Sequence, residues 1–230
     1  MNPDAALTTT LGFRTLVRER EHLPSGLTAL DAVIQGFPRG SISEILGGES
    51  SGRTTLAHTL LASATARSEI CAWVDTSDSF DPVSAAESGV TLEQVVWIRC
   101  GHNAGHALKV ADLLLHAGGF GVVVLDLCRV SNRVLNAIPI SYWYRFRRAV
   151  ENTPTVLALV EREPLAKSCA SLILEAQRRR VVWAGALLRG VEVEAGSRKP
   201  VRGETVRFFV NLGSRPGGAG AGQGPRPTTV

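Results

Sequence analysis

The sequence predicts an α/β fold with a mostly parallel sheet flanked by helices and with antiparallel strands at its C-terminal end. Between residues 23 and 211, short apolar runs alternate with segments of helical periodicity, which is typical of parallel strands joined by helices. The last three apolar runs follow each other without room for helices. These strands should therefore be antiparallel.

The expected strands are short apolar runs, at 43–46, 70–74, 95–99, 122–125, 155–160, 172–176, 181–188 and 205–210. Helices are expected at 54–66, 82–88, 104–117 and 140–151. The triplet Arg178, Arg179 and Arg180 is expected to join two strands as a charged turn. The elements form one domain at 23–212, with an N-terminal arm at 1–22 and a disordered Gly- and Pro-rich tail at 213–230.

Composition limits the class of protein. The 230 residues carry 25 basic and 21 acidic side chains, a net charge of +4, and suffice for one full core. No apolar run approaches the roughly 20 residues that span a bilayer, and the N-terminus lacks a secretory pattern, so we expect a cytoplasmic protein with reduced cysteines. All but three basic residues are arginine, which suits phosphate contacts, although a GC-rich coding sequence gives the same bias.

One segment carries most of the functional information. It follows an expected strand, opens an expected helix, and fits the phosphate-loop pattern G-x-x-x-x-G-K-[ST] except that Arg53 replaces the lysine. Glycines let successive N–H groups turn inward around phosphate, and the helix N-terminus favours an anion. The expected nucleotide-binding residues are Gly47, Gly48, Glu49, Ser50, Ser51, Gly52, Arg53, Thr54 and Thr55.

Three interpretations of this loop stay open: binding with hydrolysis, binding without hydrolysis, and a loop that keeps only its shape. Binding without hydrolysis is favoured, because arginine retains the charge but not the point contact of an ammonium group. Asp126 ends an apolar strand in the form of a Walker B element. With the Thr54 hydroxyl it is expected to support Mg²⁺ beside bound ATP or ADP.

The order of motifs resembles the RecA recombinase core. The residues that carry the resemblance are 24–31, 36–40, 43–45, 48–55 and 71–82, within about 23–185. The resemblance implies a RecA-like P-loop NTPase core. At the position of its water-activating glutamate this sequence has Ser77, with Asp75 and Asp78 as the neighbouring carboxylates. The segment 161–170 is short where a recombinase carries its DNA-binding loop, and Glu161 or Glu163 lies near its nucleotide-sensing glutamine.

Further motifs, including 143–151 and 166–170, look like the ImuA-type RecA-related proteins. That resemblance implies an accessory role in the bacterial SOS response and translesion synthesis, with translesion polymerase-type proteins and RecA as partners. Two alternatives remain. One is a slow, recombinase-like ATPase that single-stranded DNA stimulates, in which Asp75, Asp78 or Glu161 replaces the missing base. The other is a nucleotide-free interaction scaffold for polymerase partners.

Arginines in two segments are candidate contacts to single-stranded DNA or a protein partner. In 142–148, aromatic residues alternate with arginines, a pattern that can stack bases and neutralise phosphates. The same segment also fits an amphipathic helix with Trp143, Phe146 and Val150 on the sheet and its arginines in solvent. The candidate contacts are Arg145, Arg147, Arg148, Arg178, Arg179 and Arg180.

Overall fold

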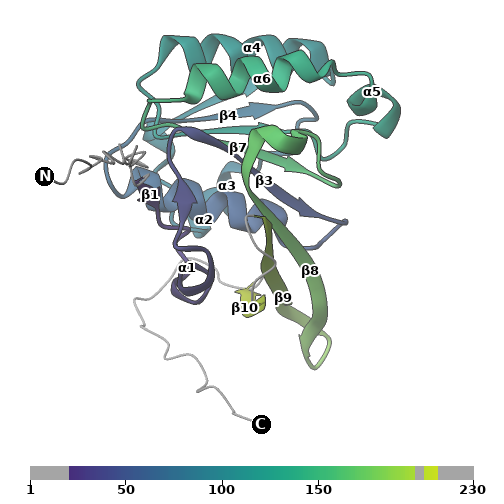
Figure 1. Ribbon diagram of the computed structural model, residues 1–230. Coiled ribbons are helices and arrows are strands. Elements are labelled where there is room, and N and C mark those ends of the chain that lie inside the picture. Colours follow the sequence, from purple (N-terminus) through teal and green to yellow (C-terminus); the bar gives the residue numbers. More distant parts are fainter. Residues whose placement is uncertain (1–20, 200–204, 212–230) are drawn as a thin grey trace, which may run out of the picture.

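The computed structural model describes residues 21–199 and 205–211. One eight-stranded sheet runs through it in the order β10-β9-β8-β3-β7-β6-β4-β5, with helices on both faces (Figure 1). Strands β3 to β8 are parallel to one another, and β9 and β10 are antiparallel to their neighbours. The strands are β3 (Ser41–Gly47), β4 (Cys71–Asp75), β5 (Val95–Arg99), β6 (Val122–Asp126), β7 (Val156–Glu161), β8 (Ala170–Ala184), β9 (Leu187–Lys199) and β10 (Thr205–Asn211).

Helices cover both faces of the sheet. One layer holds α1 (Thr28–Ile34), α2 (Arg53–Thr65) and α3 (Pro82–Glu87), and the opposite layer holds α4 (Ala104–Ala117) and α6 (Ile140–Val150) (Figure 1). The short elements α5 (Asn132–Asn136), η1 (Leu92–Gln94) and η2 (Lys167–Cys169) lie in connections. A separate two-stranded sheet pairs β1 (His22–Leu23) with β2 (Phe37–Pro38).

The central strands contribute to two hydrophobic clusters, one on each face. In β7, Val156, Ala158 and Val160 belong to the cluster under α2, whereas Leu157 and Leu159 belong to the cluster under α4 and α6. All five side chains are fully buried. A strand covered on both faces needs apolar residues throughout, which is why this part of the sequence is a continuous apolar run.

Helix α6 is amphipathic. Trp143, Phe146 and Val150 are buried against the sheet, while Tyr144 and Arg145 are exposed. The amphipathic interpretation of 142–148 is confirmed. Contact between its arginines and DNA or a partner stays a prediction.

The predicted α/β class, the mostly parallel sheet and its antiparallel end are confirmed, but two details at the end are wrong. Strand β8 is continuous through Arg178, Arg179 and Arg180, so this triplet is not a turn. The strand expected at 181–188 is divided between β8 and β9, with the turn at 185–186. The arginines tolerate a strand conformation because they are exposed and β8 is held by its pairing with β9.

Cys71, Cys100, Cys128 and Cys169 are all buried free thiols in the structure, and their reduced state in the cell stays a prediction. Among the described residues, no helix combines the length and apolarity needed to cross a bilayer. Residues 1–20 of the predicted arm and the predicted tail at 213–230 lie outside the described residues.

Candidate functional site

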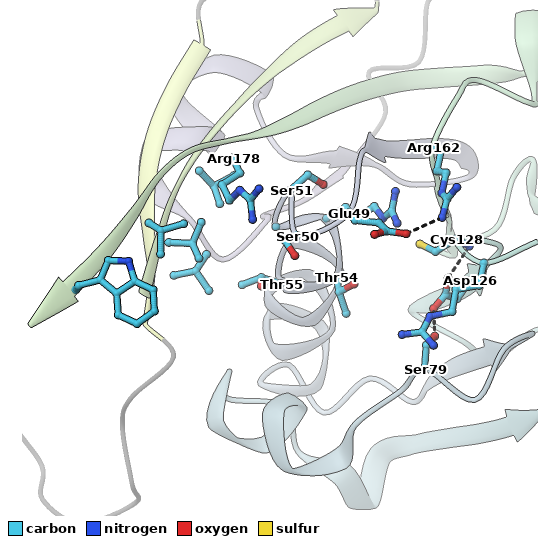
Figure 2. Close-up of a pocket in the computed structure, with 18 residues that line it drawn as sticks. Glu49, Ser50, Ser51, Thr54, Thr55, Ser79, Asp126, Cys128, Arg162 and Arg178 are labelled. Carbon is cyan, nitrogen blue, oxygen red and sulfur yellow. Dashed lines mark hydrogen bonds and ion pairs between the residues drawn. The ribbon is translucent and has the colours of Figure 1, made fainter. Parts of the chain in front are cut away.

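A cavity of about 930 Å³ lies at the carboxyl ends of the parallel strands, where open α/β sheets bind their ligands (Figure 2). The loop between β3 and α2 forms one wall, and side chains from β8, β9 and β10 form another. The residues that line it are Glu49, Ser50, Ser51, Gly52, Arg53, Thr54, Thr55, Ser79, Asp126, Cys128, Arg129, Arg162, Arg178, Val181, Trp183, Val191, Val193 and Val210.

The loop is tightly packed at Gly47 and Gly52, the two glycines of the phosphate-loop pattern. A Cβ atom at Gly47 would overlap the Ser51 side chain and lie 2.6 Å from the Ala176 carbonyl oxygen. Gly52 has φ +90°, and a Cβ atom there would lie 2.7 Å from a methyl carbon of Val193. Gly47 and Gly52 are therefore required by space, and Gly52 also by its backbone conformation.

The loop presents unpaired donors to the cavity. Within the loop, the Ser51 N–H donates to the Gly48 carbonyl at 3.4 Å, and the N–H groups of Glu49 and Ser50 have no backbone partner among the described residues. The Ser51 hydroxyl is buried and also lacks a partner there. Together with the N-terminus of α2, these donors fit a phosphate group.

Arg53 is turned back into the protein. Its side chain is buried, and its Nη1 donates to the Gly47 carbonyl and, at 3.3 Å, to the Glu161 carbonyl. The guanidinium therefore links the end of β3 to the end of β7. The positive charge of the phosphate-loop lysine is kept at the base of the loop, but part of its hydrogen-bonding capacity is taken up by main-chain carbonyls.

Asp126 lies in the cavity, as expected from its place at the end of β6. One carboxylate oxygen accepts from the Ser79 hydroxyl at 2.6 Å, and the other accepts from the Cys128 N–H at 2.9 Å. Thr54 also lines the cavity, but no hydrogen bond joins it to Asp126 within the described chain. Burial, followed by the charge of Asp126, raises the pKa of the Cys128 thiol, so this thiol is protonated and is not a nucleophile.

The turn after β4 is organised by Asp75 rather than by Ser77. The Asp75 carboxylate is fully buried and accepts from the N–H groups of Ser77, Ser79 and Phe80 at 2.9–3.1 Å. Ser77 is buried but does not line the cavity. Asp78 is exposed and forms two hydrogen bonds of 2.8 Å with the Arg99 guanidinium, which lower its pKa.

Glu161 is buried with Glu44 on the face of the sheet opposite α2. Glu44 accepts from the N–H groups of Leu165 and Ala166 at 2.8 and 2.5 Å. Within the described part of the chain, neither Glu161 carboxyl oxygen has a hydrogen-bond partner. Burial, and then the charge of Glu44, raise the pKa of Glu161 well above the ordinary glutamate value, so a protonated Glu161 can donate to Glu44.

The family model of the RecA N-terminal domain matches residues 7–133, more than half of the chain. The chain belongs to this family. RecA of Methylococcus capsulatus is 39% identical over 118 residues, which cover 50% of this chain and 34% of that protein. RecA of Mesorhizobium japonicum is 42% identical over 118 residues, 50% of this chain and 32% of that protein. RecA of Chloroflexus aurantiacus is 38% identical over 108 residues, 46% of this chain and 30% of that protein. The chain thus spans about a third of the length of the curated relatives it matches.

The arginines of this RecA-type domain that were predicted to contact DNA or a partner lie in two different parts of the structure. Arg145, Arg147 and Arg148 are exposed on α6, in the helical layer opposite α2. Arg145 is ion-paired with Asp112 of α4. The structure therefore places these α6 arginines away from the phosphate loop.

The arginines of β8 have different surroundings from one another. Arg178 lines the cavity, whereas Arg179 pairs with Glu194 at 2.6 Å and Arg180 is exposed outside the cavity lining. Two hydrogen-bonded arginines, Arg179 and Arg207, lower the pKa of Glu194 to about 2.

Several cavity residues were not predicted from the sequence. Ser79, Arg129 and Arg162 each follow the carboxyl end of a parallel strand, and that position is the signal that identifies such residues. The strand wall, Val181 and Trp183 among its members, comes from β8 to β10. These strands lie after the residues that the RecA family model matches.

Proposed function

We propose that this RecA-type chain is a nucleotide-binding accessory protein of bacterial DNA repair and damage-induced mutagenesis, with impaired ATP hydrolysis. The observation that carries the proposal is the cavity itself. It combines a phosphate loop rich in free donors with a wall of apolar side chains, and both carboxylates among its described lining residues, Glu49 and Asp126, already have partners.

The two walls support a nucleotide over inorganic phosphate alone. The loop residues from Gly47 to Thr55 offer backbone N–H groups, hydroxyls and a helix N-terminus to the phosphates of ATP or ADP. Val181, Val191 and Val210 offer an apolar surface to the base. Thr54 and Asp126 are the oxygen-bearing residues that would hold Mg²⁺, which when bound neutralises phosphate charge.

The surroundings of each carboxylate support the loss of hydrolysis. Within the cavity lining, Glu49 is exposed and ion-paired with Arg162 at 3.1 Å, and Asp126 accepts two hydrogen bonds. Outside it, Asp75 holds a turn, Asp78 pairs with Arg99, and the Glu161 side chain is on the other face of the sheet. A general base must lie within hydrogen-bond reach of the attacking water, and each of these carboxylates is either already engaged by another group or lies outside the cavity lining.

The connection after β7 supports an accessory role over strand pairing. Strand β7 ends at Glu161 and β8 begins at Ala170, so only 162–169 stand where the resemblance leads us to expect a recombinase's DNA-binding loop. We propose translesion polymerase-type proteins and RecA as partners. The exposed α6 arginines Arg145, Arg147 and Arg148 are the proposed contact to such a partner or to single-stranded DNA.

Calorimetric titration with ATP and measurement of phosphate release test the nucleotide part together. We expect ATP to bind with a dissociation constant below millimolar and phosphate release to stay at the buffer rate with and without single-stranded DNA. Absence of binding at millimolar nucleotide would overturn the nucleotide-dependent function. Turnover stimulated by single-stranded DNA would instead establish a recombinase-like ATPase.

Co-purification with the polymerase-type proteins of the same cell tests the accessory part. We expect wild type to retain them and a variant with Arg145, Arg147 and Arg148 replaced by glutamine to lose them. Retention by a variant that cannot bind nucleotide would establish the interaction scaffold without a nucleotide role. If neither protein retains a polymerase, the accessory role is wrong.

A further inference from the structure

The phosphate loop is surrounded by more positive charge than its sequence motif requires. Four arginines line the cavity, against the two carboxylates of Glu49 and Asp126. Both carboxylates already have partners, Glu49 in Arg162 and Asp126 in a hydroxyl and an N–H group. Arg129 and Arg178 have no hydrogen bond or ion pair to any residue in the described ranges. Two guanidinium groups are thus free to meet an anion.

Arg178 faces the cavity in regular alternation with the buried Leu174 and Ala176, and an irregularity in β8 then brings Val181 to the same face. Side chains of a regular strand alternate, so residues three positions apart, such as Arg178 and Val181, would point to opposite faces. The register between β8 and β9 shifts between Arg178 and Arg180, and both Arg178 and Val181 line the cavity. A bulge of this kind commonly re-aims a side chain beside a functional site.

The arginines that line the cavity approach the loop from different elements. Figure 2 shows Arg178 reaching from the strand wall toward the side of the loop that carries Ser51, and Arg162 on the opposite side with Glu49. Arg129 follows Asp126 by three residues and comes from the β6 end of the cavity. An anion seated in the loop would therefore have guanidinium groups on more than one side, and guanidinium groups bind phosphate oxygens in bidentate fashion.

A divalent cation finds fewer ligands in the same cavity. Thr54 offers one hydroxyl, and both oxygens of Asp126 already accept a hydrogen bond. Nowhere in 21–199 or 205–211 do three or more His, Cys, Asp or Glu side chains gather to hold a metal ion. Mg²⁺ beside a nucleotide takes its remaining ligands from phosphates and water, so in this cavity the protein itself supplies more guanidinium groups than metal ligands.

Resting on the proposed nucleotide binding, we infer that Arg129 and Arg178 hold the phosphates of the nucleotide in place of a divalent cation, so that ATP binds to this protein without Mg²⁺. The position of Arg178 on the α2 face of β8 and the position of Arg129 after the β6 carboxylate are the features that place the two guanidinium groups at the loop.

Calorimetric titration of the full chain with ATP, in EDTA and in Mg²⁺, tests this inference. We expect the two dissociation constants to differ by less than about threefold, because arginine charge does not depend on the metal. In EDTA, Arg178→Gln and Arg129→Gln should each weaken binding about tenfold, as the loss of a charge-assisted phosphate contact predicts. Arg180→Gln, an exposed arginine of the same strand outside the cavity lining, is the matched control and should bind as wild type does.

The outcomes separate this inference from the proposed function. Binding that disappears in EDTA and returns with Mg²⁺ would overturn the inference and leave the proposed function intact. Wild-type affinity of both arginine variants in EDTA would also overturn it. Absence of binding in both conditions would overturn the proposed function and the inference with it. The comparison between EDTA and Mg²⁺ uses wild type alone, so it does not depend on how the variants fold.

Discussion

Replacing Glu161 by glutamine should make the stability of the fold less sensitive to alkaline pH. Glu161 is fully buried beside Glu44, whose carboxylate accepts hydrogen bonds from two backbone N–H groups. Burial and the charge of Glu44 raise the pKa of Glu161 well above its ordinary value of 4.5. The folded protein therefore holds a proton on Glu161 at pH values where the unfolded chain has lost it.

The size of the effect follows from this proton. Above about pH 4.5, unfolding releases the proton, so the free energy of unfolding falls by about 1.4 kcal/mol for each pH unit until the pH reaches the raised pKa of Glu161. Glutamine has the same shape, carries no titratable proton, and can donate an N–H to Glu44. The difference in unfolding free energy between Glu161→Gln and wild type should thus grow by about 1.4 kcal/mol per pH unit over this range.

Urea unfolding followed by circular dichroism at pH 5, 6 and 7 measures this difference. The control is Glu163→Gln, a neighbouring exposed glutamate that should track wild type at every pH. A difference between Glu161→Gln and wild type that stays constant with pH would refute a protonated, buried Glu161.

Three further variants test the loop, the turn after β4 and a buried histidine. Gly47→Ala should lower the free energy of unfolding by about 1–3 kcal/mol and abolish ATP binding, because the added Cβ overlaps the loop. The control is Gly48→Ala, whose added carbon has no atom within 4 Å, and it should unfold as wild type does in the same urea titration. Asp75→Asn should lower the free energy of unfolding by about 3 kcal/mol, because it loses charge-assisted hydrogen bonds to three N–H groups. The exposed control Asp78→Asn should leave the urea midpoint unchanged. Equal midpoints for the two variants would disprove the role of Asp75 in holding the turn. Burial lowers the pKa of His58 to about 4, so unfolding takes up a proton below pH 6.5. Between pH 6.5 and pH 5, the free energy of unfolding of wild type should therefore fall by about 2 kcal/mol more than that of His58→Phe. Parallel pH profiles of the two proteins would contradict a buried neutral histidine.

The local parts of the site could be predicted from the sequence. Gly47, Gly52 and Thr54 are linked by fixed short spacings, and each spacing follows from what a phosphate loop requires of its backbone. Strand β7 was predictable because burial on both faces demands an unbroken apolar run. Asp126 was placed correctly because it directly ends such a run.

The rest of the site depends on contacts between distant segments. Arg53 bonds to the Glu161 carbonyl, 108 residues away in the sequence, and no local pattern gives that orientation. The Arg178–Arg180 triplet looks like a charged turn, but pairing with β9 keeps it in a strand, and the bulge there brings Val181 to the same face of β8 as Arg178. The strand wall exists only because β8, β9 and β10 fold back beside the loop.

Hydrogen–deuterium exchange of the full chain at millimolar ATP tests the central claim most directly. If the phosphate loop binds nucleotide through its free N–H groups, the amides from Gly48 to Thr54 should exchange at least about tenfold more slowly with ATP, while the amides of α6 should not change. Unchanged exchange of the loop amides at saturating ATP would contradict the account.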